Sequence, residues 1–219
     1  KESSAASDVY KRQELEEEHR LLDQVAGSLV RLAERLEQGE ASAADVNGFV
    51  KVFRVFVDGY HHDREENLLR TLVERAEIPG DRGPVPIIAD EHRQTAEMVT
   101  LLEASAEDRD RSPELARRIA RHLWEHVDKE ESVILPEARQ RLIRAGVPKS
   151  EGRAATADEQ AARALAEELV ARFPPLDDPE VIRGDGCIAC SKFGETCGGI
   201  EMEWWNDWEM QHYRSLDEG

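Results

Sequence analysis

Two short strings of histidine and acid, each inside a helical pattern, have the composition of a metal-binding motif. One, HHDREE, starts at His61, and the other, HVDKEE, starts at His126. Both have the form H-x-D-basic-E-E, which aligns Glu65 with Glu130, each four residues after its histidine. Because residues four apart lie on one face of a helix, each string can direct one imidazole and one carboxylate toward the same point.

A second pair of strings adds one histidine each. EEHR and DEHR end at Arg20 and Arg93, which aligns His19 with His92. Along the chain the order is therefore EHR, HxxxEE, EHR, HxxxEE, and this order indicates a duplicated helical hairpin.

Long helices are expected to position these strings. Apolar residues recur at spacings of three and four, which is typical of helices that pack in a bundle. Ser42 followed by Asp45 predicts a capped helix start. Short connections predict an all-α fold, an antiparallel up-down four-helix bundle with an extra C-terminal helix. The expected helices cover roughly residues 9–38, 42–77, 86–107, 113–144 and 157–173.

The four aligned histidines lie in phase with the apolar seams of their helices, so the bundle core should hold four imidazoles and two carboxylates. Buried carboxylates without partners cost several kcal/mol each. A pair of metal ions would remove that cost, because imidazole suits Fe, Zn, Cu or Ni and a carboxylate can bridge two ions. A single seam histidine is usually a hydrogen-bonded core residue, but one on every helix favours a metal site.

The ordered strings EHR, HxxxEE, EHR and HxxxEE-x-x-x-LP resemble the hemerythrin-like family, also called the HHE cation-binding domain, over roughly residues 10–142. The resemblance implies a four-helix bundle around a non-haem di-iron centre that the two glutamates bridge. Carried over residue by residue, it implies two Fe ions with the ligands His19, His61, Glu65, His92, His126 and Glu130.

The sequence departs from this family at one position. Oxygen-carrying members have a fifth histidine one turn after the third-helix histidine, where this chain has Ala96. The coordination position is then either open or filled by another group. His122, one turn before His126, either reaches the metal, supports a ligand from outside or is an ordinary core residue. His62 aligns with a valine in the repeat, so we expect a boundary position for it, with ligation as the alternative.

A di-iron centre with an open position could bind or sense O2, NO or peroxide. The alternatives are a redox enzyme, which reduces peroxide or NO or oxidises iron, and a protein that handles iron or repairs clusters. An enzyme would also need an electron donor. The missing fifth histidine weakens the carrier interpretation, since a carrier needs a well-saturated centre.

Composition excludes other classes of function. Acids outnumber bases 47 to 29 among 219 residues, and the net charge of −18 argues against nucleic acid and anionic membrane as partners. No apolar run approaches the roughly 18 residues of a membrane span. The first ten residues have no apolar signal core, and cytoplasm is the default location.

The chain is expected to have three parts: the bundle at 1–146, a linker and fifth helix at 147–178, and a Cys/Trp-rich tail at 179–219 that docks on the bundle. The tail contains a CxxC spacing that suits a structural Zn, part of an Fe–S cluster, a redox disulfide or free thiols. The residues of this second site are Cys187, Cys190, Cys197 and His212.

Overall fold

The computed structural model describes residues 3–147 and 153–178. The predicted site at Cys187, Cys190, Cys197 and His212 lies outside these residues. Within the described ranges the secondary structure is helical, without a strand, which confirms the all-α prediction.

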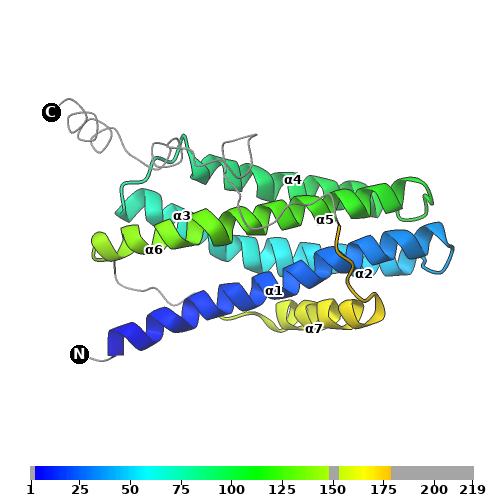
Figure 1. Cartoon of the computed structure of the whole chain (residues 1–219), viewed down its shortest axis with the longest axis horizontal. Coiled ribbons are helices and arrows are strands. Elements are labelled where there is room, and N and C mark those ends of the chain that lie inside the picture. Colours follow the sequence, from blue (N-terminus) through cyan, green and yellow to red (C-terminus); the bar gives the residue numbers. More distant parts are fainter. Residues whose placement is uncertain (1–2, 148–152, 179–219) are drawn as a thin grey trace.

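Long helical rods lie along the long axis of the molecule, and the shorter helix α7 lies against one side of them (Figure 1). In chain order, α2, η1 and α3 follow one another as one continuous rod, and so do α5, η2 and α6. The elements are α1 (Ser3–Glu37), α2 (Ala43–Val52), η1 (Phe53–His62), α3 (Asp63–Arg75), α4 (Pro84–Ala104), α5 (Arg111–Lys129), η2 (Glu130–Ile134), α6 (Leu135–Arg144) and α7 (Ala157–Arg172).

Local sequence explains where these helices begin and end. The backbone amide of Ser42 donates to the Asp45 carboxylate at 2.9 Å, which is the predicted capping interaction at the start of α2. Gly39, with φ of 72°, provides the left-handed residue that ends α1. Pro84 stands in the first turn of α4, where a missing amide costs nothing.

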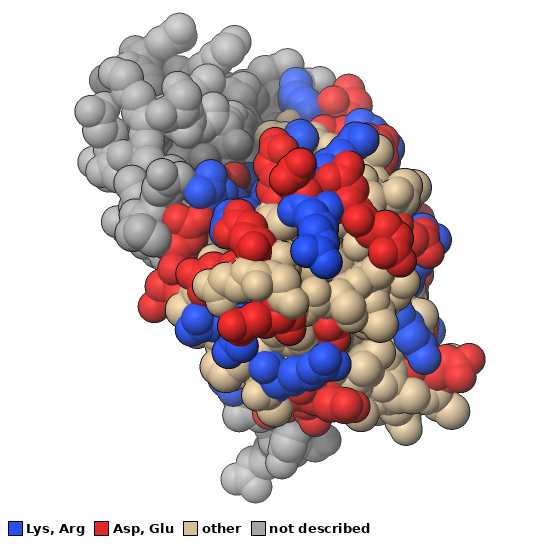
Figure 2. Space-filling view, turned by 90° about the vertical axis from the view of Figure 1, so that its right-hand side faces the viewer, with Lys and Arg blue, Asp and Glu red and all other residues tan. Residues whose placement is uncertain are grey.

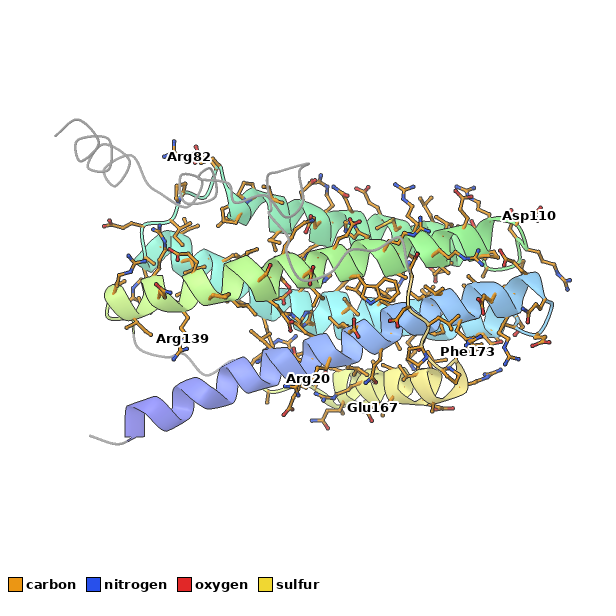
Figure 3. All side chains as sticks on the ribbon, in the orientation of Figure 1. Arg20, Arg82, Asp110, Arg139, Glu167 and Phe173 are labelled. Carbon is orange, nitrogen blue, oxygen red and sulfur yellow. The ribbon has the colours of Figure 1, made fainter. Side chains whose placement is uncertain are left out.

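A large apolar core fills one half of the bundle and also supports α7. Leu22, Leu29 and Phe53 are fully buried in it, and each such side chain contributes about 1.5–3 kcal/mol relative to exposure. Phe173, directly after α7, packs at 5.8 Å from the Phe49 ring. Figure 3 shows Phe173 turned toward the bundle and Glu167 turned away from it, so α7 is held by its inner face.

Two π-helical segments interrupt the rods at the predicted metal-binding strings. In a π-helix each amide bonds to the carbonyl five residues earlier, so the turn is wider and successive side chains are separated by less than the about 100° of an α-helix. η1 ends with His61 and His62, and both side chains are buried. η2 begins at Glu130, which is also buried. Each histidine–acid string therefore overlaps a place where the α-helix is interrupted by a π-helical segment.

The surface carries both signs of charge. Acidic and basic side chains are interspersed on the face shown in Figure 2. Among the described helices, none combines the length and the apolar character that crossing a membrane requires.

Candidate metal centre

Nitrogen and oxygen donors gather in two groups inside the bundle, and one glutamate belongs to both. Within each group the donor atoms lie within 4.8 Å of one another, and every residue is buried. The first group, called site A, draws on α1, η1, α3 and η2. The second, called site B, draws on η1, α3, α4 and α5. Site A consists of His19, His61, Glu65 and Glu130, and site B of His62, Glu65, His92 and His126.

Two carboxylates span the two sites. Oε1 of Glu65 lies 3.0 Å from Nε2 of His61, and its Oε2 lies 3.4 Å from Nε2 of His92. Oε2 of Glu130 lies 3.4 Å from Nε2 of His19 and 3.5 Å from Nε2 of His126. Each glutamate therefore faces both sites, which is the position a bridging carboxylate requires.

Several buried atoms of this core have no hydrogen-bond partner in the part of the chain that the structure describes. The contacts of Glu65 with His61 and His92 are short but lack hydrogen-bond geometry. Such groups cost free energy unless something else satisfies them. Apart from Nδ1 of His62 and Oδ1 of Asp58, which face each other on the outer side, those on the site histidines and glutamates point into the two sites, so the donor set fits a pair of cations. The atoms that point inward are Nε2 of His61, His62, His92 and His126, and Oε2 of Glu65 and Glu130.

The pKa values show how strongly this core attracts positive charge. Burial lowers the pKa of His61, but the carboxylates of Glu65 and Glu18 outweigh it and raise that pKa to about 9. Burial also opposes the charge on Glu65, yet His61 and His19 hold its pKa well below the usual range. By contrast, burial and the neighbouring His92 keep the pKa of His62 well below normal. His62 is therefore a neutral imidazole, the form that binds metal.

Each imidazole also has a carboxylate on its outer side. Four of the histidines donate a hydrogen bond from Nδ1 to such a carboxylate. The pairs are His61 with Glu18 at 2.9 Å, His126 with Glu91 at 3.0 Å, His19 with Glu131 at 3.2 Å and His92 with Glu66 at 3.4 Å. Asp58 lies 3.1 Å from Nδ1 of His62. Such outer carboxylates fix the tautomer and the orientation of metal-binding histidines. They leave the Nε2 atoms directed at sites A and B.

Two basic side chains complete this outer layer. Arg64 pairs with Glu18, and Lys129 pairs with Glu91. Each glutamate is thus held between a cation and a metal-site histidine. In both halves of the repeat, the histidines, the basic residue and the glutamates belong to the site or to its outer layer. The glutamate of EHR orients the histidine of the next HxxxEE string, and the basic residue of that string holds the glutamate.

A cavity of about 290 Å³ lies between α1 and α5 and reaches site A. Its lining includes His19 and Glu131 together with Trp124 and Val127. His19 is otherwise buried, with 1% of its surface exposed. Of the site A residues, His19 alone lines this cavity, together with Glu131, to which its Nδ1 donates.

A family model, the hemerythrin HHE cation-binding domain, matches residues 11–138. The chain belongs to this family. The match covers α1 to α5 and η2, all of the residues of sites A and B, and nearly the same range as the sequence resemblance. No curated protein and no solved structure matches the chain significantly.

Within this hemerythrin domain, His62 lies beside the two other histidines of site B. Its ring stacks on that of His92 at 3.9 Å between centroids and lies 5.5 Å from that of His126. Site B therefore has three imidazoles although α4 supplies only one. The sequence left the role of His62 open, because the repeat aligns it with Val127, and the geometry favours ligation.

His122 occupies a different place from the other histidines of the hemerythrin domain. Nε2 of His122 donates to the backbone carbonyl of Glu91 at 3.1 Å, and the residue is half-buried outside both donor groups. Burial lowers its pKa, so it stays neutral. The structure thus favours the supporting role that the sequence left open for His122.

The glutamates and cations of the outer layer were not identified from the sequence. The sequence does contain a pattern that marks these residues, because Glu18 and Glu91 precede the aligned histidines and Arg64 and Lys129 align in the repeat. Their partners lie on other helices, and alignment alone does not show which residue faces which.

Proposed function

We propose that this protein holds two iron ions, bridged by Glu65 and Glu130, and binds or senses O2 or a related small molecule such as NO or peroxide. The scaffold is the antiparallel four-helix bundle expected for the family. The observation that carries the proposal is that two buried four-donor groups share Glu65, whose two oxygens face different sites. Carboxylate bridging with imidazole ligands suits a pair of iron ions.

The two sites support different tasks. Site B has three imidazoles, whereas site A has only two, and the position related to His62 by the repeat is Val127. Site A, with fewer imidazoles, is therefore the better candidate for an outside ligand, and the cavity beside His19 and Val127 borders it. When bound, the iron pair would supply the redox-active centre that such a ligand needs.

The residues of the chain hold and shield this centre. The imidazoles would bind the ions through Nε2, the outer carboxylates hold the rings in place, and Trp124 and Val127 line the cavity beside His19. This arrangement supports reversible binding. The alternative, a redox enzyme or an iron-handling protein, would use the same two sites but needs an electron donor or iron release.

The test is metal analysis followed by optical spectroscopy. The protein is loaded with Fe²⁺ without oxygen, its iron is counted, and O2, NO or peroxide is then added. Two irons per chain and a spectral change that reverses when O2 is removed would support the proposal. Continuous consumption of peroxide or NO with a reductant would favour the enzyme. A chain that binds no metal in the bundle would contradict both.

A further inference from the structure

The segment at 153–178 lies beyond the matched family region, yet it touches the helix that carries two of the site histidines. Arg153, just before α7, is exposed, but its side chain still contacts residues of η1 and α3. Its Nη2 donates to the Gly59 carbonyl at 2.6 Å, and its Nε donates to the Asp63 carboxylate at 3.1 Å. Its guanidinium carbon also lies 5.1 Å from the centre of the Tyr60 ring.

These contacts lie at the point where the π-helix η1 changes into the α-helix α3. In a regular α-helix the amide of Asp63 would bond to the carbonyl of Gly59. Here that amide is directed to the carbonyls of Tyr60 and His61 instead. The Gly59 carbonyl accepts from Arg153. Arg153 thus takes up a carbonyl that the change of helix type releases from its α-helical partner.

The same change of helix type places both adjacent histidines in the core. In an α-helix, neighbours point about 100° apart, so one of two consecutive residues usually turns away from a narrow site. The wider π turn reduces this angle. His61 belongs to site A and His62 to site B, and both are buried. The geometry of η1 therefore favours the two-site arrangement, because it brings two neighbouring imidazoles to adjoining sites.

Arg153 is itself held in place by the first turn of α7. Glu159 accepts from Nη1 and Nη2 of Arg153 at 2.8 and 2.7 Å. The same carboxylate accepts from the amide of Thr156, which caps α7. A planar guanidinium held by a two-pronged carboxylate has a fixed direction. The guanidinium group can therefore donate its remaining hydrogens to the Gly59 carbonyl and the Asp63 carboxylate with little further loss of side-chain entropy.

We propose that Arg153 is a positioning residue of the metal centre, which holds the change from π- to α-helix at which His61 and His62 both face the core. This inference rests on the proposed metal binding. It assigns the appended helix α7 a role in the centre besides covering the apolar core.

Arg172 provides a matched control. It also ties the α7 segment to the bundle, with Nη1 at 2.7 Å from the Asp45 carboxylate and its guanidinium carbon 5.3 Å from the centre of the Phe173 ring. Its contacts lie at the opposite end of α7 from Arg153. Loss of either arginine weakens the attachment of α7, but only Arg153 touches η1.

The experiment compares wild type, Arg153→Ala, Arg153→Lys and Arg172→Ala. Each metal-free protein is titrated with Co²⁺, and amide hydrogen exchange is measured at residues 59–64. In Arg153→Ala we expect about 10–100-fold weaker Co²⁺ binding, as for loss of an outer-layer partner, with faster exchange at 59–64. Arg172→Ala should bind Co²⁺ as tightly as wild type does. Arg153→Lys should have an intermediate affinity, because lysine lacks the planar guanidinium group that donates in several directions.

Equal Co²⁺ affinity and equal exchange in Arg153→Ala and Arg172→Ala would overturn the inference. Equal losses in both variants would show a general effect of α7 and would overturn it as well. A wild-type chain that binds no ion overturns the proposed function and this inference together. Wild-type binding that persists in full in Arg153→Ala overturns this inference alone.

Discussion

Nδ1 of His61, in η1, donates a hydrogen bond of 2.9 Å to the carboxylate of Glu18, which is in α1. Both side chains are buried, and Arg64 pairs with the other oxygen of Glu18. This contact fixes the ring through the atom that faces away from the metal site, so Nε2 remains directed at site A. The same relationship recurs between His126 and Glu91.

The first prediction concerns this outer contact. Glu18→Gln keeps the shape of the side chain but removes its charge, and with it the ion pair to Arg64. We expect about 10–100-fold weaker metal binding, measured by competition with a coloured chelator. Glu17→Gln, at the exposed neighbouring position, is the control and should bind as wild type does. Equal affinities in the two variants would argue against a role for Glu18.

The second prediction concerns the shared carboxylate. Glu65→Ala removes an oxygen from site A and another from site B, so we expect loss of both ions, measured by elemental analysis of the purified protein. Glu97→Ala, at an exposed position of α4, should retain them. A Glu65→Ala protein with two firmly bound ions would rule out the bridging role.

The third prediction separates the two histidines whose role the sequence left open. His62→Ala removes an imidazole from site B, so we expect the affinity of one ion to fall by more than the about 10–100-fold typical of an outer partner. The other ion should remain. His122→Ala, which removes a contact with the Glu91 carbonyl, should keep both ions. Competitive titration distinguishes these outcomes, and the opposite pattern would exchange the two roles.

The fourth prediction tests how the chain after α7 is attached to α1. A Cβ at Gly27 would lie 2.7 Å from Cβ of Pro175 and 2.9 Å from the Leu176 carbonyl oxygen. Alanine usually gains about 1 kcal/mol over glycine inside a helix, but here the clash should cost about 1–3 kcal/mol. Gly27→Ala should therefore lower the melting temperature.

Gly48→Ala is the matched control for this substitution. Its Cβ would contact Leu169 at 3.4 Å, an ordinary distance. The melting temperature should stay constant or rise in this variant. A rise of the melting temperature in both variants would show that residues 175 and 176 can move aside for the added methyl group at little cost in stability.

The fifth prediction is a dependence on pH. Arg153 lowers the pKa of Glu159 to about 2, against burial and with help from Thr156. Because the folded pKa lies below the usual 4.5, this stabilisation is complete above about pH 4.5 and is lost as the pH falls toward 2. In metal-free protein, the melting temperature of wild type should therefore fall more steeply with acid than that of Glu159→Gln. Parallel curves would show that the pair contributes nothing.

Much of this arrangement could be predicted from the sequence, because it follows from spacing along single helices. The seams predicted the rods, Ser42 and Asp45 predicted a helix start, and the repeat brought His61 and His126 to equivalent positions. The π-helical segments could not be predicted in this way, since a bond to the fifth residue back leaves no mark in composition.

The repeat also misdirects where the two halves differ. It pairs His62 with Val127 and so argued for a boundary position, whereas the widened turn of η1 carries His62 into site B. The contact of Arg153 with Gly59 joins residues far apart in the chain. No local pattern shows such a contact in advance.

The difference between His62 and Val127 makes the two halves of the centre chemically unequal. Site B has three imidazoles and site A has two, while Glu65 and Glu130 face both sites. Nitrogen-rich surroundings favour borderline ions such as Zn²⁺, and oxygen-richer ones suit harder ions such as Mn²⁺. Stepwise loading should therefore yield a heterobimetallic protein, in which Zn²⁺ is spectroscopically silent and a paramagnetic ion such as Mn²⁺ reports on its own half alone.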